Sequence, residues 1–457
     1  MAYNDIFFIL ALLPLSVIIS FFDNSAEYKN LISIITGIIF IAWGRPIGVL
    51  VVCLFFLFDW LIALLIGKVK VSSRAGASAL LVLDLLFNIS IFIVYTRGNV
   101  IPLPGKLTLK STLIPFAMGY YVLRAFSYVY DVYKGEEAEK NPLYLLTYFT
   151  SAQFMMCGPV IRYKDIKPQL HSRRADGRMI SGGFDLIVYG LAKVMIIASA
   201  LNKASSAGLE ASDVSFFGCW LGMAAYFGAA YFTLSGFCEI SRGFGLMNGF
   251  VFSENFAPID SKAGFTGLVR GYNTTVTHFF EEALYSPFAG KKALSAAMAF
   301  VCCIAVAAWY SFSKPVLLAG ALAGAVVVLE LLLLRERISK LPAAVRYLYL
   351  IILSMLIFGI CRFGTVYGWR RWALGLVGVG DKYLISKQLK TVIMNNLFVF
   401  ISGLIIVISP LKSFLARRGE VWQASSGRAY SFIEGVKTVF KAILLVMCIS
   451  SMVIAGL

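Results

Sequence analysis

Histidine is nearly absent from this chain of 457 residues, which has only His171 and His278. Charged residues are also scarce: they make up 14%, against about 25% in an ordinary soluble protein, whereas hydrophobic residues reach 59%. None of the eight cysteines forms a CxxC pair, so we expect free thiols and no metal site. The composition excludes a water-soluble globular protein and indicates a membrane protein.

Long apolar runs recur from one end of the chain to the other, and a membrane-spanning helix needs about 20 such residues. The pattern predicts an all-α polytopic membrane protein with about a dozen helices, forming one membrane domain over residues 1–457. The first run lacks a basic flank and a cleavage site, so we expect it to be retained as a helix. The runs are Ile6–Phe22, Leu31–Trp43, Pro46–Ile66, Ala77–Tyr95, Leu113–Tyr130, Phe184–Leu201, Phe216–Thr233, Ala293–Trp309, Val316–Leu334, Tyr347–Ile360, Val392–Ile408 and Val436–Ile454.

The formal net charge is +17, and the basic residues gather between the apolar runs. Lys68, Lys70 and Arg74, for example, follow the third run. Basic loops of this kind reflect the positive-inside bias and attraction to anionic headgroups. We therefore predict membrane lipids, and no nucleic acid, as partners.

Residues 110–315 differ from the rest because their apolar segments are rich in Gly, Pro, Asn, Thr, Ser and aromatic residues. Irregular backbone at membrane depth is tolerated only where protein buries it or where it lines a wet cavity. We therefore expect the functional pocket here. Four stretches stand out: Gly119–Gly135, Gln153–Asp165, Tyr231–Phe256 and Arg270–Gly290.

Ionisable residues mark two of these stretches. Glu239 and Arg242 lie three residues apart, which places them on one helix face where they can pair. An ionisable pair near membrane depth is a candidate functional site, although a pair that only fixes helix orientation fits equally well. Glu281 and Glu282 are adjacent in the fourth stretch. In the second stretch, a Gly-Pro pair predicts a kinked or re-entrant helix.

The four stretches, in this order, resemble the membrane-bound O-acyltransferase family, in particular the bacterial branch that acetylates alginate and D-alanylates teichoic acid. The first contains SYVYDVYKG, the second GPVIRYKD, the third YFTLSGFCEISRGFGLMNGFVFSENF and the fourth YNTTVTHFFEEALYSPFAG. The resemblance is carried by residues 115–335.

The resemblance implies a ring of tilted helices around a central funnel, multi-pass in the bacterial cytoplasmic membrane. It implies no resident cofactor, and acyl-CoA or a carrier-protein thioester as the acyl donor. It also implies a partner in the form of an extracytoplasmic acyltransferase or a component of polysaccharide synthesis.

The two family histidines are replaced in this chain. Alignment on Leu284-Tyr285-x-Pro287 puts Asn273 at the first position, and Trp309-Tyr310 stands where the family has Trp-His. His278 lies five residues after Asn273, so on a helix it points roughly 140° away. His171 falls in a basic segment that we expect to be a solvated loop.

The resemblance thus assigns the catalytic positions to Asn273 and Tyr310. It assigns substrate binding to Trp309, Tyr285, Glu239, Arg242, Glu281 and Glu282.

Three hypotheses follow from these replacements. Histidine suits O-acyl transfer because its pKa near 6.5 lets it accept and return a proton at neutral pH, whereas asparagine does not titrate and tyrosine titrates near pH 10. The chain is then a degenerate acyltransferase-fold protein acting as a scaffold or conduit. The alternatives are an active O-acetyltransferase with a relocated base (Glu239, Glu281, Glu282 or a deprotonated Tyr310) and an unrelated transporter.

Overall fold

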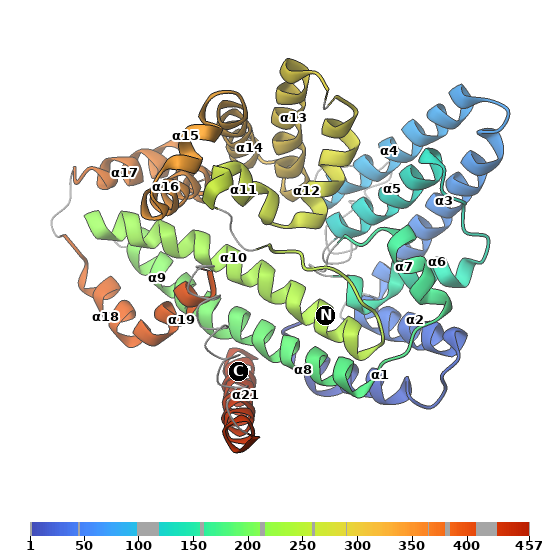
Figure 1. Ribbon diagram of the computed structural model, residues 1–457, viewed down its shortest axis with the longest axis horizontal. Helices are drawn as coiled ribbons and strands as arrows, with labels where there is room; N and C mark the ends of the chain where they lie inside the picture. Colours follow the sequence, from blue (N-terminus) through green and yellow to red (C-terminus); the bar gives the residue numbers. More distant parts are fainter. Residues whose placement is uncertain are drawn as a thin grey trace, which may run out of the picture. The chain divides into compact units, whose positions relative to one another are not determined.

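A computed structural model describes residues 2–43, 46–97, 118–155, 160–210, 215–257, 261–288, 290–363, 365–379, 384–407 and 427–456. The regular elements in these ranges are helices (Figure 1). The extended pairing among them is one isolated bridge between Phe256 and Tyr272. The predicted all-α fold class is confirmed. The Gly158-Pro159 break predicted from the second stretch lies outside the described residues.

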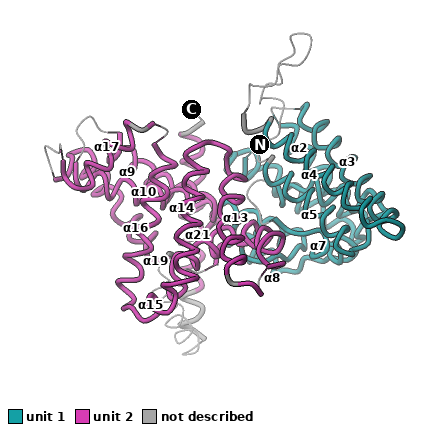
Figure 2. Tube along the Cα trace, turned by 90° about the horizontal axis from the view of Figure 1, so that it is seen from above, with its two compact units in different colours: residues 1–187, 237–254 teal, residues 188–236, 255–457 magenta. Residues whose placement is uncertain are grey.

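The helices divide into two compact units (Figure 2). Unit 1 comprises residues 1–187 and 237–254, and unit 2 comprises residues 188–236 and 255–457. Helices α8 (Gly177–Ala192) and α10 (Phe216–Met247) contribute residues to both units. The prediction of one membrane domain over residues 1–457 stays a prediction.

Eight helices of the described chain are long and apolar enough to cross a membrane, and a ninth candidate is a pair bent by 69° at Asn396. This confirms a multi-pass membrane protein. Other predicted runs form shorter helices, such as α1 (Leu13–Ile19), α2 (Ala26–Ala42) and α5 (Met118–Lys134). The eight are Ile47–Val69, Arg74–Ile93, Gly177–Leu209, Phe216–Met247, Ala293–Tyr310, Lys314–Lys340, Ala343–Arg362 and Glu434–Ile454.

Unit 1 joins the first and second motif stretches through polar contacts. Arg162 pairs with Asp131 on α5, and the Tyr163 hydroxyl donates to Glu139 at 2.8 Å. Burial opposes the ionisation of Glu139 and would raise its pKa. The N–H of Asn141 and the hydroxyl of Tyr163 donate hydrogen bonds to its carboxylate, and Lys167 lies nearby. These three groups outweigh burial and hold the pKa of Glu139 below its usual range. The other helices of this unit are α3 (Ile47–Val69), α4 (Arg74–Arg97), α6 (Pro142–Thr150) and α7 (Tyr163–His171).

The expectation that His171 lies in a loop is wrong. His171 is the last residue of α7, and its ring lies 4.1 Å from that of Tyr144. The residue is exposed, as expected of a solvated side chain.

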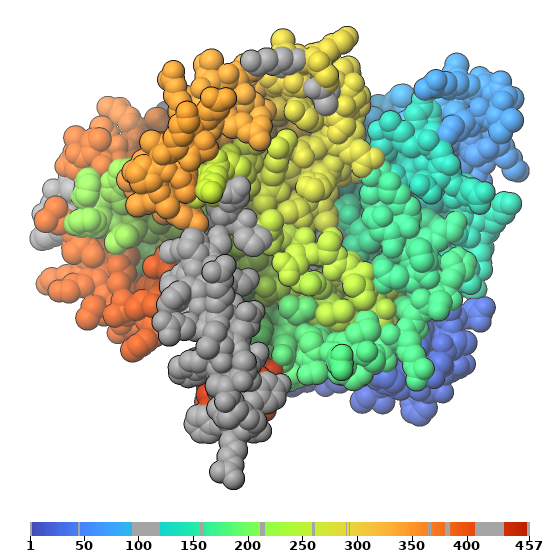
Figure 3. Space-filling view, viewed as in Figure 1, coloured from blue at the N-terminus to red at the C-terminus, as the bar shows by residue number. Residues whose placement is uncertain are grey.

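Unit 2 contains a tightly packed hairpin of α13 (Lys292–Tyr310) and α14 (Lys314–Leu329), drawn in yellow to brown in Figure 1, and the space-filling view in Figure 3 shows the residues near position 300 in yellow. Gly320 and Gly324 of α14 face α13. A Cβ added at Gly320 would lie 2.4 Å from the Cβ of Ala307, and one at Gly324 would lie 2.9 Å from the ring of Phe300. Small residues four apart let membrane helices approach this closely. The hairpin fixes the C-terminal end of α13.

The remaining helices of unit 2 follow in chain order. They are η4 (Lys193–Ala198), α9 (Ser199–Leu209), η5 (Ser261–Ala263), α11 (Gly264–Gly271), α12 (Thr274–Phe280), η6 (Glu281–Tyr285), η7 (Ser286–Phe288), η8 (Glu330–Leu334), α15 (Arg335–Lys340), α16 (Ala343–Arg362), α17 (Val366–Leu376), α18 (Lys387–Asn395), α19 (Leu397–Val407) and α21 (Gly427–Gly456).

Substituting Gly320→Ala should destabilise the hairpin by about 1–3 kcal/mol, because the new methyl group has no space beside Ala307. The measurement is thermal unfolding of the purified chain in detergent. Gly182→Ala in α8 is the matched control, since nothing lies within 4 Å of a Cβ there, and alanine favours a helix over glycine by about 1 kcal/mol. Equal unfolding temperatures for the two variants would contradict the close approach of α13 and α14.

Candidate functional site

The start of α11 is fixed by the buried carboxylate of Glu330. Its Oε1 accepts from the N–H of Phe265 at 2.7 Å and from the Tyr349 hydroxyl at 2.9 Å, and its Oε2 accepts from the N–H of Thr266 at 2.7 Å and the Thr266 hydroxyl at 2.6 Å. The first N–H groups of a helix have no partner within the helix, and they attract negative charge. Glu330 therefore caps α11 from another helix.

Gly264, immediately before these N–H groups, has a φ of +67°. A Cβ there would lie 2.6 Å from the Glu330 carboxylate. The backbone angle and the short distance both require glycine at this position.

Asn273 occupies the turn between α11 and α12. Its φ of 54° lies in the left-handed region, which asparagine tolerates better than most residues. The side chain is 2% exposed. Its Oδ1 accepts from Asn255 Nδ2 at 2.7 Å, and Asn255 Oδ1 in turn accepts from the Thr275 hydroxyl at 2.8 Å. The amide of Asn273 is thus held in one orientation.

That orientation directs Asn273 Nδ2 to the hydroxyl of Tyr310, which accepts its hydrogen bond at 2.7 Å. Tyr310 is the last residue of α13 and is 38% exposed. The neighbouring Trp309 is buried, and its ring lies 4.8 Å from that of Tyr310 at 66°. The two positions assigned to the family histidines, 37 residues apart in the chain, therefore touch.

No imidazole lies at this contact. His278 sits on α12 with an exposed side chain, as its offset of five residues from Asn273 predicts, and it is the last histidine of the chain. The polar side chains that these hydrogen bonds join are the amides of Asn255 and Asn273 and the phenol of Tyr310.

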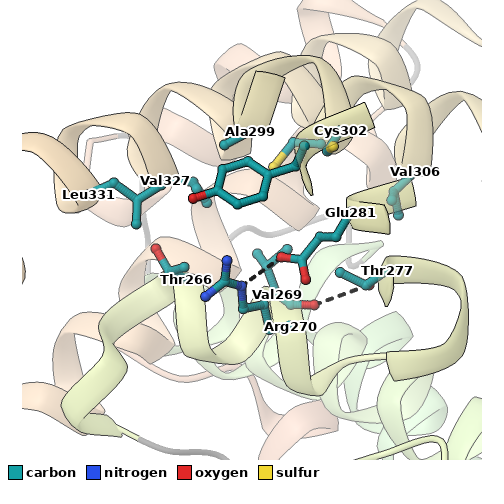
Figure 4. A pocket seen from close by; sticks show the side chains of 12 residues that line it. Thr266, Val269, Arg270, Thr277, Glu281, Ala299, Cys302, Val306, Val327 and Leu331 are labelled. Atoms are coloured by element: carbon teal, nitrogen blue, oxygen red, sulfur yellow. Dashed lines mark hydrogen bonds and ion pairs between the residues drawn. The ribbon is translucent and has the colours of Figure 1, made fainter. Parts of the chain in front are cut away.

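A small cavity lies beside α11, η6 and α13 (Figure 4). Glu281 and Tyr285 of the fourth stretch line it, together with Thr266, Val269, Arg270, Thr277, Ala299, Cys302, Cys303, Val306, Val327 and Leu331. The cavity has a volume of about 30 Å³, which is enough for roughly two water molecules. The cavity is too small for a thioester donor.

The charged groups of this cavity neutralise each other. Arg270 Nε donates to Glu281 Oε1 at 2.6 Å, and the two side chains point toward one another in Figure 4. Glu282 is exposed and is not among the lining residues. Of the two adjacent acids, Glu281 alone therefore faces the cavity.

Glu239 and Arg242 lie in the part of α10 that belongs to unit 1, whereas the other candidates belong to unit 2. Arg242 Nη1 forms an ion pair with Glu254 at 2.7 Å. The predicted pairing of Glu239 with Arg242, and the binding roles of both, stay predictions.

Sequence reasoning gave no role to two residues of the site. Asn255 orients Asn273, and Arg270 pairs with Glu281. Arg270 precedes Glu281 by eleven residues, which is three helical turns, so a single helix would have suggested the pairing; the turn at Asn273 removes that regularity. The sequence offered one indication that Asn255 belongs to the site, which is that Asn255 lies within the third motif stretch.

Comparison with known proteins places this geometry in context. No protein-family model matches the chain. It is 27% identical over 303 residues to the probable alginate O-acetylase AlgI of Pseudomonas aeruginosa and 25% identical over 303 residues to that of Azotobacter vinelandii. It is 22% identical over 330 residues to the peptidoglycan O-acetyltransferase of Helicobacter pylori.

The chain is similar to these proteins over part of their length. The alignments cover 64% of the chain in each case, and 58%, 60% and 62% of the three relatives, so the chain matches less than two thirds of their length. The relationship agrees with the family resemblance of the four motif stretches.

Glu330→Gln should destabilise the chain by about 2–3 kcal/mol, because an NH₂ group would replace an oxygen that accepts from two donors. Unfolding in detergent measures this loss. Glu336→Gln, at an exposed position of α15, is the matched control and should change stability little. Our assignment of Glu330 as the cap of α11 would be wrong if the two variants unfolded at the same temperature.

Proposed function

We propose that the chain is a membrane component of bacterial cell-surface polysaccharide O-acylation that has lost its own catalytic base and serves as a scaffold or conduit. The names of its relatives, a probable alginate O-acetylase and a peptidoglycan O-acetyltransferase, support polysaccharide O-acylation. They also favour this class over an unrelated transporter. Its place would be the bacterial cytoplasmic membrane, which its apolar helices suit.

The observation that carries the proposal is the hydrogen bond from Asn273 Nδ2 to the Tyr310 hydroxyl. Alignment with the family motifs chose these two positions independently of any structure, and they prove to be in contact. A contact between two substituted positions is expected if the scaffold of a histidine pair persists after both imidazoles are replaced.

The chemistry of the contact argues against base catalysis. The Tyr310 oxygen accepts a hydrogen bond from Asn273 Nδ2. An amide and a phenol in this arrangement present hydrogen-bond donors, which can bind an acyl or sugar oxygen. They do not withdraw a proton from a sugar hydroxyl at neutral pH, a step for which a positioned base contributes about 10²–10⁴-fold.

A thioester would enter this scheme as the acyl donor, either acyl-CoA or an acylated carrier protein. The cavity beside Arg270 and Glu281 holds about two waters, so a donor would need another opening. The partner implied by the proposal is an extracytoplasmic acyltransferase or another component of polysaccharide synthesis, which would supply the base that this chain lacks.

The second candidate is an active O-acetyltransferase with a relocated base. Among the acids named above, Glu281 is the strongest candidate for the relocated base. It belongs to η6, the element that follows α12, and it faces the cavity. Its carboxylate already accepts from Arg270 at 2.6 Å, so it would have to exchange that partner for a sugar hydroxyl. The other possible bases under this hypothesis are Glu239, Glu282 and a deprotonated Tyr310.

Transfer of a labelled acetyl group from acetyl-CoA by the purified chain separates the candidates. We expect the wild type to transfer acetyl groups no faster than a control without protein, and Asn273→His/Tyr310→His to exceed that background rate at least about tenfold, well within the contribution of a general base. Histidine is among the residues that tolerate the backbone angle of Asn273. Tyr367→His/Asn395→His, at two exposed positions, controls for added imidazole.

Wild-type turnover that Glu281→Gln abolishes would establish the second candidate instead. If both the wild type and the Asn273→His/Tyr310→His variant fold but neither transfers acetyl groups, this result would contradict the view that the histidine scaffold persists.

A further inference from the structure

A second polar cluster lies in unit 1, within the hairpin of α3 and α4. Asp59 is near the middle of α3, and Asp84 and Asn88 are one turn apart near the middle of α4. Their exposed fractions are 0%, 0% and 1%. Ionisable residues at the centre of a membrane span are costly and usually mark a functional site. The proposed function does not use them.

The amide of Asn88 draws both carboxyl groups together. Its Nδ2 donates to Asp59 Oδ1 at 3.0 Å and to Asp84 Oδ2 at 3.3 Å, and also to the backbone oxygen of Asp84 at 3.0 Å. The two acids, 25 positions apart in sequence, thus converge on one nitrogen. The donors of this amide are then fully used.

Three buried oxygens of the cluster, Asp59 Oδ2, Asp84 Oδ1 and Asn88 Oδ1, accept no hydrogen bond from a nitrogen or hydroxyl group among the described residues. A buried acceptor without a donor costs about 1–3 kcal/mol, and more if charged. The two carboxyl groups also form a side-chain hydrogen bond with each other, which requires a positive charge, such as a proton, between them.

The described residues around the cluster supply no lysine or arginine as such a partner. In the described part of the chain, neither carboxyl group forms an ion pair with a lysine or arginine. The ionisable residue of α5 that interacts with Asp59 is Tyr128, which carries no positive charge. Aromatic rings flank the cluster, with Phe58 and Phe87 stacked at 3.8 Å. Two ionised carboxylates in such an apolar environment would repel each other strongly.

We propose that Asp59, Asp84 and Asn88 form a binding site for one monovalent cation, a proton or Na⁺, inside the α3–α4 hairpin. Carboxylate and amide oxygens are the ligands that hard cations prefer. A single positive charge leaves the two-carboxylate site with one net negative charge and gives the unpaired oxygens a partner. The described residues contain no group of three or more His, Cys, Asp or Glu side chains able to hold a metal ion, which favours a monovalent cation over a divalent one.

Thermal unfolding of the full chain in detergent tests this site and distinguishes its two cations. The wild type is compared in NaCl and in choline chloride of equal concentration, at about pH 6 and about pH 8.5. If Na⁺ is the ligand, it should raise the unfolding temperature by about 2–4 °C at the higher pH, where protons compete less. If the ligand is a proton, Na⁺ should have no effect and the unfolding temperature should fall as pH rises, because the folded chain binds a proton that the unfolded chain has released.

Asp59→Asn/Asp84→Asn should abolish either response. Glu136→Gln/Glu137→Gln removes two exposed carboxylates from the loop after α5 and should keep the wild-type response. Identical Na⁺ and pH dependence in the wild type and the Asp59/Asp84 variant would overturn the proposal.

If the Asp59→Asn/Asp84→Asn variant does not fold, two measurements on the wild type test whether the site binds a cation. They are the binding of radioactive sodium and the infrared band of a protonated carboxyl that disappears as pH rises. The absence of both signals would equally overturn the proposal. Neither measurement depends on acyl transfer, so it stands apart from the proposed function.

Discussion

The buried carboxylate of Glu330 is the interaction on which the geometry of the candidate site depends. Phe265 and Thr266 at the start of α11 are buried, and their N–H groups have no partner within the helix, so α11 needs an acceptor from elsewhere in the protein. Glu330 provides one from the end of α14, with further donors from Thr266 and Tyr349. This contact fixes where α11 begins and therefore where it ends, at the turn that holds Asn273.

The same hairpin that carries Glu330 also carries Tyr310. α13 ends at Tyr310, and α14 begins four residues later and leads to Glu330. Close packing at Gly320 and Gly324 keeps the two helices in register. One rigid hairpin therefore supplies both the cap of α11 and the hydroxyl that Asn273 meets. The Asn273–Tyr310 contact is a consequence of this framework, and it persists without an ionised group at either position.

The sequence predicted much of the fold because apolar runs of membrane length need no knowledge of their neighbours. The short run Leu31–Trp43, which contains enough apolar residues for a helix but few for a full span, lies in the 17-residue helix α2 and its C-cap residue Trp43. The motif alignment identified Asn273 and Tyr310, yet their contact depends on the left-handed backbone of Asn273, which no local pattern specifies. The pairing of Arg242 with Glu254 arises because the chain turns back after α10, so helix periodicity gave no sign of it.

Two kinds of buried acid coexist in this chain, and their hydrogen bonds separate them. Each oxygen of Glu330 accepts from two donors, so the charge is compensated by the fold and the residue needs nothing from outside. Asp59 and Asp84 instead share the single nitrogen of Asn88, and their remaining contact is with each other, which two ionised carboxylates cannot make without a cation between them. Burial alone would rank all three acids alike. A buried acid whose acceptors are filled supports the structure, whereas one whose acceptors remain open requires a ligand, and for this reason we place the cation at Asp59 and Asp84 and none at Glu330.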